Sequence, residues 1–250
     1  MKIVIHPKYR AYGDFIAQIP VIFNQSGETV YRGRNVVKRF TVGGNAWMVK
    51  RYKRPHLIQR IAYTFFKKSK AERAYLYAGR LLDAGIATPE GIAYIEEKHR
   101  GLLCDSYFVS TVCPDPAVYP VLVKAEAYDR ELADALAAFF VQLHGKGILH
   151  GDPNLNNILY RKGDGGGGYL FSVIDTNRSV FKPRLTPREC LENLKRVTHR
   201  RDLLRHITAE YARLRGWDVQ ESVERVMEAL DRFEKRNKMK RRLKSFGRSS

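Results

Sequence analysis

The sequence of residues 150–175, HGDPNLNNILYRKGDGGGGYLFSVID, contains two acidic signals. One is the tripeptide His-Gly-Asp that ends at Asp152, with Asn157 five residues later. The other is Asp175, which directly follows an apolar run. The residues between Asn157 and Asp175 are predicted to form a hairpin with a glycine-rich turn at 163–168. A loop, a hairpin and a second loop can bring the three polar side chains together.

These residue types and their order suit phosphoryl transfer from ATP. That reaction needs an Asp that orients or deprotonates the acceptor hydroxyl, and an Asn and a second Asp that hold Mg²⁺ against the phosphates. Asp152, Asn157 and Asp175 follow one another in the order in which kinases carry these groups. The alternative is an Asp-Pro-Asn turn whose Asn side chains only cap backbone groups. Further kinase parts upstream would favour the first interpretation.

Upstream, Lys50 is a candidate phosphate-binding residue. The segments 36–42 and 46–52 are predicted to be strands joined by a turn at Gly43-Gly44-Asn45. Lys50 lies within the second, apolar strand, where it could pair with the phosphates of a nucleotide. The alternative is a lysine on an edge strand that discourages aggregation.

Glu72 is the candidate partner of that lysine. It lies in the first turn of a helix predicted from about Lys70 to Ala84, and it is the only acidic residue between Lys50 and Asp83. A kinase needs a helix glutamate that pairs with the strand lysine, so Glu72 is chosen by elimination. The alternative is a first-turn glutamate that only stabilises the helix dipole.

Three further candidates rest on position alone. Gly27 and Gly33 bound a loop expected where a kinase has its phosphate-covering loop, although the pattern G-x-G-x-x-G is absent. Val112 lies in the segment 111–114, which is expected to form the hinge whose backbone receives the adenine ring.

The net charge of +19 is concentrated in two segments. Residues 50–70 and 235–250 each carry eight Lys or Arg and no acid, so together they hold 16 of the 19 net charges. Such segments indicate a polyanionic partner, which could be a nucleic acid, an anionic membrane surface or a phosphorylated substrate. A solvated face and a solubilising tail are the alternatives.

The segment 57–66 is predicted to be an amphipathic helix with cations at both ends. A basic, aromatic-rich helix of this kind can lie in a membrane interface. Such an apolar stripe more often packs on the core, which is the expectation here.

The cysteines and the absence of a recognisable targeting or membrane segment narrow the class of protein only a little. Cys104, Cys113 and Cys190 show no paired or metal-ligand spacing, which suits a reducing cytoplasm. No signal-peptide core or membrane-spanning stretch is recognisable, so a soluble or peripheral protein is expected. The first 20 residues receive no role.

A strand lysine, a helix glutamate, His-Gly-Asp with its Asn, and a second Asp thus occur in kinase order. The sequence resembles the protein-kinase-like superfamily and, within it, the lipopolysaccharide-core kinases, the Kdo and heptose kinase family of Gram-negative bacteria. The resemblance covers roughly residues 27–198. Its most specific pieces are 67–72, 150–157 and 174–178.

The resemblance implies an α+β, bilobal protein-kinase-like fold. Residues 1–112 would form a nucleotide-binding lobe, an antiparallel sheet with a helix of the type that carries the kinase glutamate. Residues 113–234 would form a shortened, mainly helical catalytic lobe, followed by a basic tail at 235–250.

It also implies roles for the candidate residues, with ATP and Mg²⁺ as cofactors. Asp152 would be the catalytic base, Asn157 and Asp175 would be Mg²⁺ ligands, Lys50 would hold the α- and β-phosphates, and Glu72 would pair with Lys50. His150 would brace the loop.

The implied acceptor is a Kdo or heptose hydroxyl on a core oligosaccharide linked to lipid A. The protein would act as a monomer in the cytoplasm, peripheral on the inner-membrane face of a Gram-negative bacterium. An anionic membrane surface is the favoured further partner, and nucleic acid is less favoured.

Departures from the protein-kinase pattern favour a non-protein acceptor. Gly151 and Asn154 stand where protein kinases carry an Arg and a Lys, and Thr176 stands where they carry a Phe. The alternatives are a compact atypical Ser/Thr kinase or ATPase associated with RNA, an antibiotic-type or other small-molecule kinase, and a non-enzymatic kinase-like scaffold.

Overall fold

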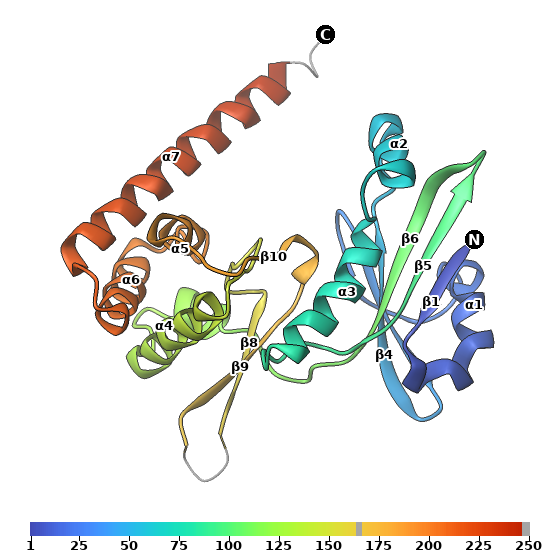
Figure 1. Ribbon diagram of the computed structural model, residues 1–250, viewed down its shortest axis with the longest axis horizontal. Coiled ribbons are helices and arrows are strands. Elements are labelled where there is room, and N and C mark those ends of the chain that lie inside the picture. The colour runs from blue at the N-terminus through green and yellow to red at the C-terminus, as the bar shows by residue number, and fades with distance from the viewer. Residues whose placement is uncertain (164–166, 247–250) are drawn as a thin grey trace. The chain divides into compact units, whose positions relative to one another are not determined.

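The computed structural model describes the backbone of residues 1–163 and 167–246, and the side chains of residues 1–163 and 167–240 (Figure 1). Part of the glycine-rich turn expected at 163–168 therefore lies outside the described residues.

The chain divides into two units. The first contains Met1–Pro114 and Ser172–Arg178, and the second contains Asp115–Phe171 and Ser179–Ser250. The sequence predicts one boundary between the two lobes, after residue 112, whereas residues 172–178 belong to the first unit of the structure. Backbone hydrogen bonding explains the return, because Val173 N donates to Ala87 O over 2.9 Å and Thr88 Oγ1 donates to Val173 O over 2.6 Å.

A six-stranded antiparallel sheet with the order β1-β5-β6-β4-β3-β2 forms the body of the first unit. Its strands are β1 (Lys2–Ile5), β2 (Glu28–Arg32), β3 (Val36–Val42), β4 (Asn45–Tyr52), β5 (Gly91–His99) and β6 (Leu102–Thr111). The predicted turn between β3 and β4 is confirmed. Gly43 and Gly44 have φ angles of 55° and 78°, a region that glycine adopts without steric cost.

The N-terminal residues cover one face of this sheet. The 3-10 helix η1 (Pro7–Tyr12) leads into α1 (Gly13–Ile22), and β1 pairs with β5 at the edge of the sheet. Ile16, Ile19 and Phe23 are fully buried against apolar side chains of the strands. Those side chains are Phe40, Val42, Trp47, Val49, Ile92, Ala93, Ile95, Tyr107 and Val109. The segment without a predicted role therefore keeps a large apolar surface out of water.

Helix α3 (Lys70–Asp83) packs on the other face. The strand residues beneath it, such as Tyr52 and Tyr94, alternate with those that face α1. Small side chains on α3, including Ala71 and Ala74, are buried there and allow a close approach. The helix begins at Ser69, whose hydroxyl accepts a hydrogen bond from the third helical N–H, as preferred N-caps do.

Helix α2 (Leu57–Phe65) contradicts the expectation that its apolar stripe packs on the core. None of its residues is buried, and its large apolar side chains are exposed. Two polar side chains attach it to β6 instead. Arg60 Nε donates to Leu103 O over 2.8 Å, and Thr64 Oγ1 accepts from Leu103 N over 2.9 Å. The expectation was wrong because periodicity identifies an amphipathic helix without identifying the side that faces the protein.

The second unit is mainly helical, as predicted. Its helices are α4 (Arg130–Gly145), α5 (Pro187–Leu194), α6 (Arg201–Arg215) and α7 (Val219–Phe246). Helix α6 packs against both α4 and α7. Four large side chains of α4 are fully buried, namely Leu132, Leu136, Phe140 and Leu143. Helix α5 begins with a capping box between Thr186 and Glu189.

Short elements connect these helices and flank the candidate residues Asp152, Asn157 and Asp175. They are the π-helical turn η2 (Pro120–Lys124), β7 (Ile148–Leu149), β8 (Ile158–Lys162), β9 (Tyr169–Val173), the 3-10 turn η4 (Thr176–Arg178) and β10 (Val180–Phe181). β8 pairs with β9, and β7 pairs with β10. The strand β9 leads the chain from the second unit into the first.

Helix α7 continues into the segment predicted to be a basic tail. Most of the basic segment 235–250 is therefore helical. Among the described residues, no helix combines the length and the apolar content needed to cross a membrane.

Candidate functional site

Lys50 lies on the internal strand β4, opposite Val37 of β3 and Phe108 of β6. The alternative of a protective edge-strand lysine therefore does not apply. Its Nζ lies 2.8 Å from Oδ1 of Asp175 and 5.4 Å from the ring centroid of Tyr52. The Lys50 and Asp175 side chains are 19% and 33% exposed, so the ion pair is shielded and still accessible.

Asp175 is held in an uncommon conformation. Its φ angle is 58°, in the left-handed region that few residues other than glycine occupy, although Asp and Asn tolerate it. Two residues later, Asn177 shares a side-chain hydrogen bond with the buried Tyr52. Burial, followed by the carboxylate of Asp175, raises the pKa of Tyr52, so its hydroxyl stays neutral beside the ion pair. Such local backbone strain often marks functional positions.

Glu72 does not pair with Lys50 in this structure. Its Oε1 lies 3.4 Å from Nζ of Lys68 and 3.8 Å from Nζ of Lys2 on β1. The reason is its position around α3. Each residue advances about 100° around a helix, and the face of α3 that looks toward the sheet carries alanines. Glu72 lies on the side next to β1, away from Lys50.

The sequence predicted Glu72 beside Lys50, but cations surround the Lys50–Asp175 pair instead. Burial, followed by the charges of Arg34, Arg178 and Arg73, lowers the pKa of Lys70, while Asp175 opposes this shift. The Nε atom of Arg73 is buried and has no hydrogen-bond partner among the described residues. These four cations come from the β2–β3 turn, α3 and η4, and their density suits an anionic ligand. Sequence reasoning missed the group because its members are far apart in the chain.

The two candidate glycines occupy different places. The expected loop between them is wrong, because residues 28–32 form β2. Gly33 lies in the β2–β3 turn, where its N–H donates to Asn35 O over 3.0 Å. Gly27 precedes β2 with a φ angle of 80°, and a Cβ there would lie 2.6 Å from the Phe40 ring. Gly33 thus lies in a turn and Gly27 in the stretch before a strand, and the role of either in covering a phosphate stays a prediction.

Val112 directly follows β6 in the stretch that ends the first unit. It is half-buried, and the preceding Thr111 N donates to Glu90 O over 3.0 Å. The role of its backbone in holding adenine stays a prediction.

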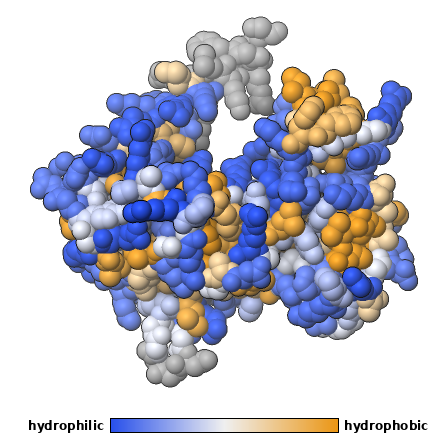
Figure 2. Space-filling model, viewed as in Figure 1, coloured by the Kyte–Doolittle hydropathy of each residue, from blue (hydrophilic) through white to orange (hydrophobic). Residues whose placement is uncertain are grey.

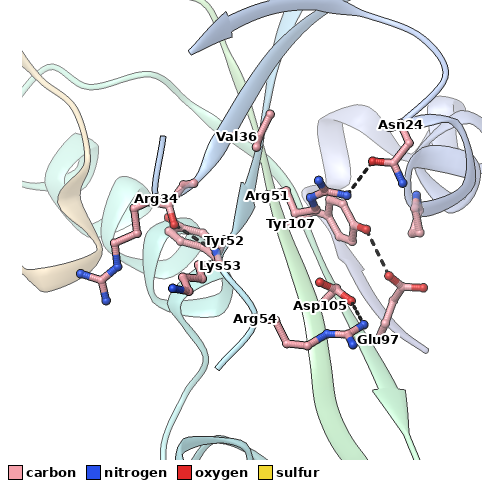
Figure 3. Close-up of a pocket in the computed structure, with 12 residues that line it drawn as sticks. Asn24, Arg34, Val36, Arg51, Tyr52, Lys53, Arg54, Glu97, Asp105 and Tyr107 are labelled. Atoms are coloured by element: carbon pink, nitrogen blue, oxygen red, sulfur yellow. Dashed lines mark hydrogen bonds and ion pairs between the residues drawn. The ribbon is translucent and has the colours of Figure 1, made fainter. Parts of the chain in front are cut away.

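A pocket of about 500 Å³ opens elsewhere in the first unit (Figure 3). Figure 3 shows that several of its charged groups are paired: Arg51 with Asn24 at 2.8 Å, and Arg54 with Asp105 at 2.6 Å. Lys50 and Asp175 do not line this pocket. The pocket and the ion pair are therefore different features, although Arg34 belongs to the lining of one and the surroundings of the other.

In the second unit, Asp152 and Asn157 lie in a loop held by its own side chains. Asn157 Nδ2 donates to Asp152 O over 2.9 Å, and Asp152 N donates to Nδ1 of His150 over 3.1 Å. Asn154 accepts from the N–H of Asn156 over 3.0 Å. These side chains therefore cap backbone groups, as expected for a structural turn, in the same loop that holds the candidate catalytic residues.

The buried Asn193 of α5 and the half-buried Arg196, just after that helix, brace this loop. Asn193 Nδ2 donates to His150 O over 2.8 Å, and Arg196 Nη1 donates to Gly151 O over 2.7 Å. The Oδ1 of Asn193 lies 3.1 Å from Nε2 of His144, which must therefore carry the proton. Burial lowers the pKa of His144 to about 4, so the ring is neutral. The sequence placed His150 as a brace but did not identify Asn193, Arg196 or His144.

The two candidate Mg²⁺ ligands each offer an oxygen donor, which is the kind of ligand that Mg²⁺ prefers. Asp175 offers a carboxylate. The nitrogen of the Asn157 amide must face the carbonyl of Asp152, because only the nitrogen can donate to it. The amide oxygen is therefore directed elsewhere and can serve as a ligand.

Comparison with protein families identifies one match. The model of the Lipopolysaccharide kinase (Kdo/WaaP) family matches residues 22–216, which is well over half of the chain. A search of curated proteins gave no match.

Solved structures of similar fold include three phosphotransferases. "WaaP in complex with acyl carrier protein" is 18% identical, with a TM-score of 0.62, over 96% of this chain and 99% of that chain. The aminoglycoside-3'-phosphotransferase of type VIII is 14% identical, with a TM-score of 0.57, over 91% and 100%. The Rio2 kinase-ADP/Mg²⁺-phosphoaspartate complex from Chaetomium thermophilum is 15% identical, with a TM-score of 0.51, over 94% and 74%. At these identities the likeness shows the fold alone.

Proposed function

Because the chain belongs to the lipopolysaccharide kinase (Kdo/WaaP) family, we propose that it transfers a phosphoryl group from ATP to a Kdo or heptose hydroxyl of the lipopolysaccharide inner core. The predicted family and protein-kinase-like fold are confirmed, and with them the prediction that the chain is a phosphotransferase. The sugar, the hydroxyl and the dependence on ATP and Mg²⁺ belong to the proposal.

The ion pair between Lys50 and Asp175 carries this proposal. A nucleotide bound with a divalent cation offers phosphate groups to Lys50 and the cation to Asp175. Lys50 can therefore exchange Asp175 for phosphate, and Asp175 can exchange Lys50 for the cation. Bound Mg²⁺ would neutralise charge on the phosphates, with Asp175 and Asn157 as its protein ligands. The nearby cations Lys70 and Arg73 would add to the attraction for phosphate.

Asp152 would orient the acceptor hydroxyl and take its proton as the oxygen attacks phosphorus. The hydrogen bonds to the carbonyls of His150, Gly151 and Asp152 keep this loop in one conformation before substrate arrives. Preorganisation of this kind is how phosphoryl-transfer enzymes lower the barrier. Glu72 has a secondary role in this scheme, because its partners are Lys68 and Lys2.

The acceptor class follows from the family and from the loop residues. Gly151 and Asn154 replace the Arg and Lys that serve protein kinases, which supports a sugar acceptor over a peptide. The acceptor would be core oligosaccharide linked to lipid A, at the cytoplasmic face of the inner membrane.

The test is transfer of ³²P from Mg-ATP to three acceptors: Kdo-bearing lipid A, heptosylated core and a generic protein. The wild-type protein is compared with Asp152→Asn and with the matched control Asp134→Asn, an exposed aspartate of α4. We expect label in a glycolipid, reduced by about 10²- to 10⁴-fold in Asp152→Asn and unchanged in the control. Label that enters only protein, or none of the acceptors, would refute the proposed function.

A further inference from the structure

Helix α2 presents its polar side to the protein and its apolar side to solvent. Besides its bond to Leu103, Arg60 donates from Nη2 to His99 O over 3.2 Å, and Thr64 Oγ1 donates to Arg60 O over 2.7 Å. The bonds to Leu103 and His99 anchor the helix to the β5–β6 hairpin. An amphipathic helix that belongs to a protein core has the opposite orientation.

The outward stripe is large and continuous. Side chains at the helical spacing of 57, 58, 61 and 65 are exposed, and Phe66 extends the stripe at the C-terminal end. The exposed fractions reach 75% for Ile58, 66% for Phe65 and 80% for Phe66. Figure 2 shows the corresponding orange patch at the position of α2. A contiguous apolar patch of this kind marks an interaction surface.

Cations border the stripe at both ends. Lys53 and Arg54 precede the helix, and Lys67 and Lys68 follow it, all with exposed side chains. The adjoining turn of the β5–β6 hairpin adds exposed Lys98 and Arg100. The sequence from residue 50 to 71 contains no acid. The surface therefore combines apolar area with a border of positive charge.

We propose that α2 lies flat in the headgroup region of an anionic phospholipid bilayer, with its apolar stripe toward the acyl chains. The purpose of this membrane contact rests on the proposed function, because an enzyme bound at the bilayer surface can reach a lipid-linked acceptor. Helices with a strong apolar face and basic flanks bind membranes in this way. A second copy of the chain fits less well, because a two-fold symmetric contact would oppose the same cations.

The test measures co-sedimentation of the full-length protein with phosphatidylcholine vesicles, with and without phosphatidylglycerol. We expect binding to the anionic vesicles, weakened by about tenfold or more in Ile58→Ser/Phe65→Ser. The matched control, Val21→Ser/Leu214→Ser, removes exposed apolar side chains from α1 and α6 and should bind like the wild type. Lys53→Gln/Lys67→Gln should weaken binding by about fivefold for each charge, and added salt should do the same.

Phe65→Trp gives a second readout. Trp47 is buried and distant in sequence, and Trp217 lies in the second unit, so a vesicle-dependent blue shift specific to the variant reports on α2. Absence of that shift, or equal vesicle binding by Ile58→Ser/Phe65→Ser and wild type, would overturn the proposal. The proposal would also be overturned if the wild-type protein did not bind anionic vesicles and the stripe instead mediated dimer formation in sedimentation experiments. Binding of the stripe to an acidic protein, without vesicle binding, would overturn it as well.

Phosphate transfer separates this inference from the proposed function. Ile58→Ser/Phe65→Ser should phosphorylate a water-soluble Kdo oligosaccharide at the wild-type rate and a vesicle-embedded acceptor several-fold more slowly. If wild type phosphorylated neither acceptor but bound vesicles through α2, the function would fail and the membrane surface would stand.

Discussion

In the first unit the candidate ligand-binding groups are charges that hold one another, whereas in the second unit they lie in a loop fixed by hydrogen bonds to its backbone. Lys50 and Asp175 form an ion pair surrounded by further cations. The loop of Asp152 is held through its carbonyls by Asn193 and Arg196.

The ion pair of the first unit can exchange its partners when a ligand binds, whereas the hydrogen-bonded loop of the second unit stays in place. An accessible ion pair gains little net stability and can be replaced by ligand charges of both signs. Buried hydrogen bonds to a backbone cost more to break, because each unpaired group loses its solvation without compensation. Substitutions in the first unit should therefore affect ligand binding and chemistry, and those in the second unit should affect both stability and chemistry.

Among substitutions at the ion pair, the loop brace and α3, the largest effect is expected for Asp175→Asn. Asparagine tolerates the left-handed conformation at this position, so the substitution removes charge with little backbone strain. Loss of the anion should lower kcat by on the order of 10³ without lowering thermal stability. Steady-state kinetics and thermal melts check this. A large loss of stability would show that the ion pair is structural, contrary to the comparison.

Asn193→Ala should lower both the stability of the protein and its kcat. It leaves the carbonyl of His150 and Nε2–H of His144 without their partner, which should cost about 2 kcal/mol of unfolding free energy. A displaced Asp152 loop should lower kcat by up to about 10²-fold while KM for ATP stays constant. Asn156→Ala, in the exposed part of the same loop, is the control and should change neither quantity. Wild-type kinetics in Asn193→Ala would mean that the brace is dispensable.

The stability of the second unit should depend on pH through His144. Burial lowers its pKa from 6.5 to about 4, so the unfolded chain binds a proton that the folded unit excludes. The contribution is fully present above pH 6.5 and is lost as pH falls toward 4, by about 3 kcal/mol in total. Hydrogen exchange of α4 and α6 amides between pH 7 and 4 measures it. The same slope in His144→Gln would assign the effect to other groups.

The smallest effects concern α3. Glu72→Gln should change kcat/KM by less than about threefold, because the partners Lys68 and Lys2 are exposed and such pairs contribute little. Arg73→Gln should raise KM for ATP more than that, since Arg73 belongs to the cations near Asp175. The reverse ranking would show that Glu72 reaches Lys50 when a nucleotide binds.

Much of the fold was predictable because its signals are local. The Gly43–Gly44 turn, the Thr186 capping box and the helical stripe of α4 each depend on neighbours a few residues apart. The same is true of the loop motif around Asp152. The role of residues 1–24 was not predictable, because it depends on the apolar face that the distant strands form together in the folded sheet.

Pairings between distant segments required the structure. Elimination selected Glu72 because it is the acid in the first turn of its helix. Rotation around α3 instead brings Lys70 and Arg73 toward Asp175. The brace from Asn193 to His150 joins residues 43 positions apart and has no local signature.

The sequence by itself determined the family, the kinase order of Lys50, Asp152, Asn157 and Asp175, and the amphipathic character of α2. Residue type, spacing and charge suffice for these. Only the tertiary structure decided that Lys50 pairs with Asp175 and that α2 turns its apolar side outward. Both depend on where a side chain points once strands and helices pack, and a one-dimensional pattern does not contain that direction.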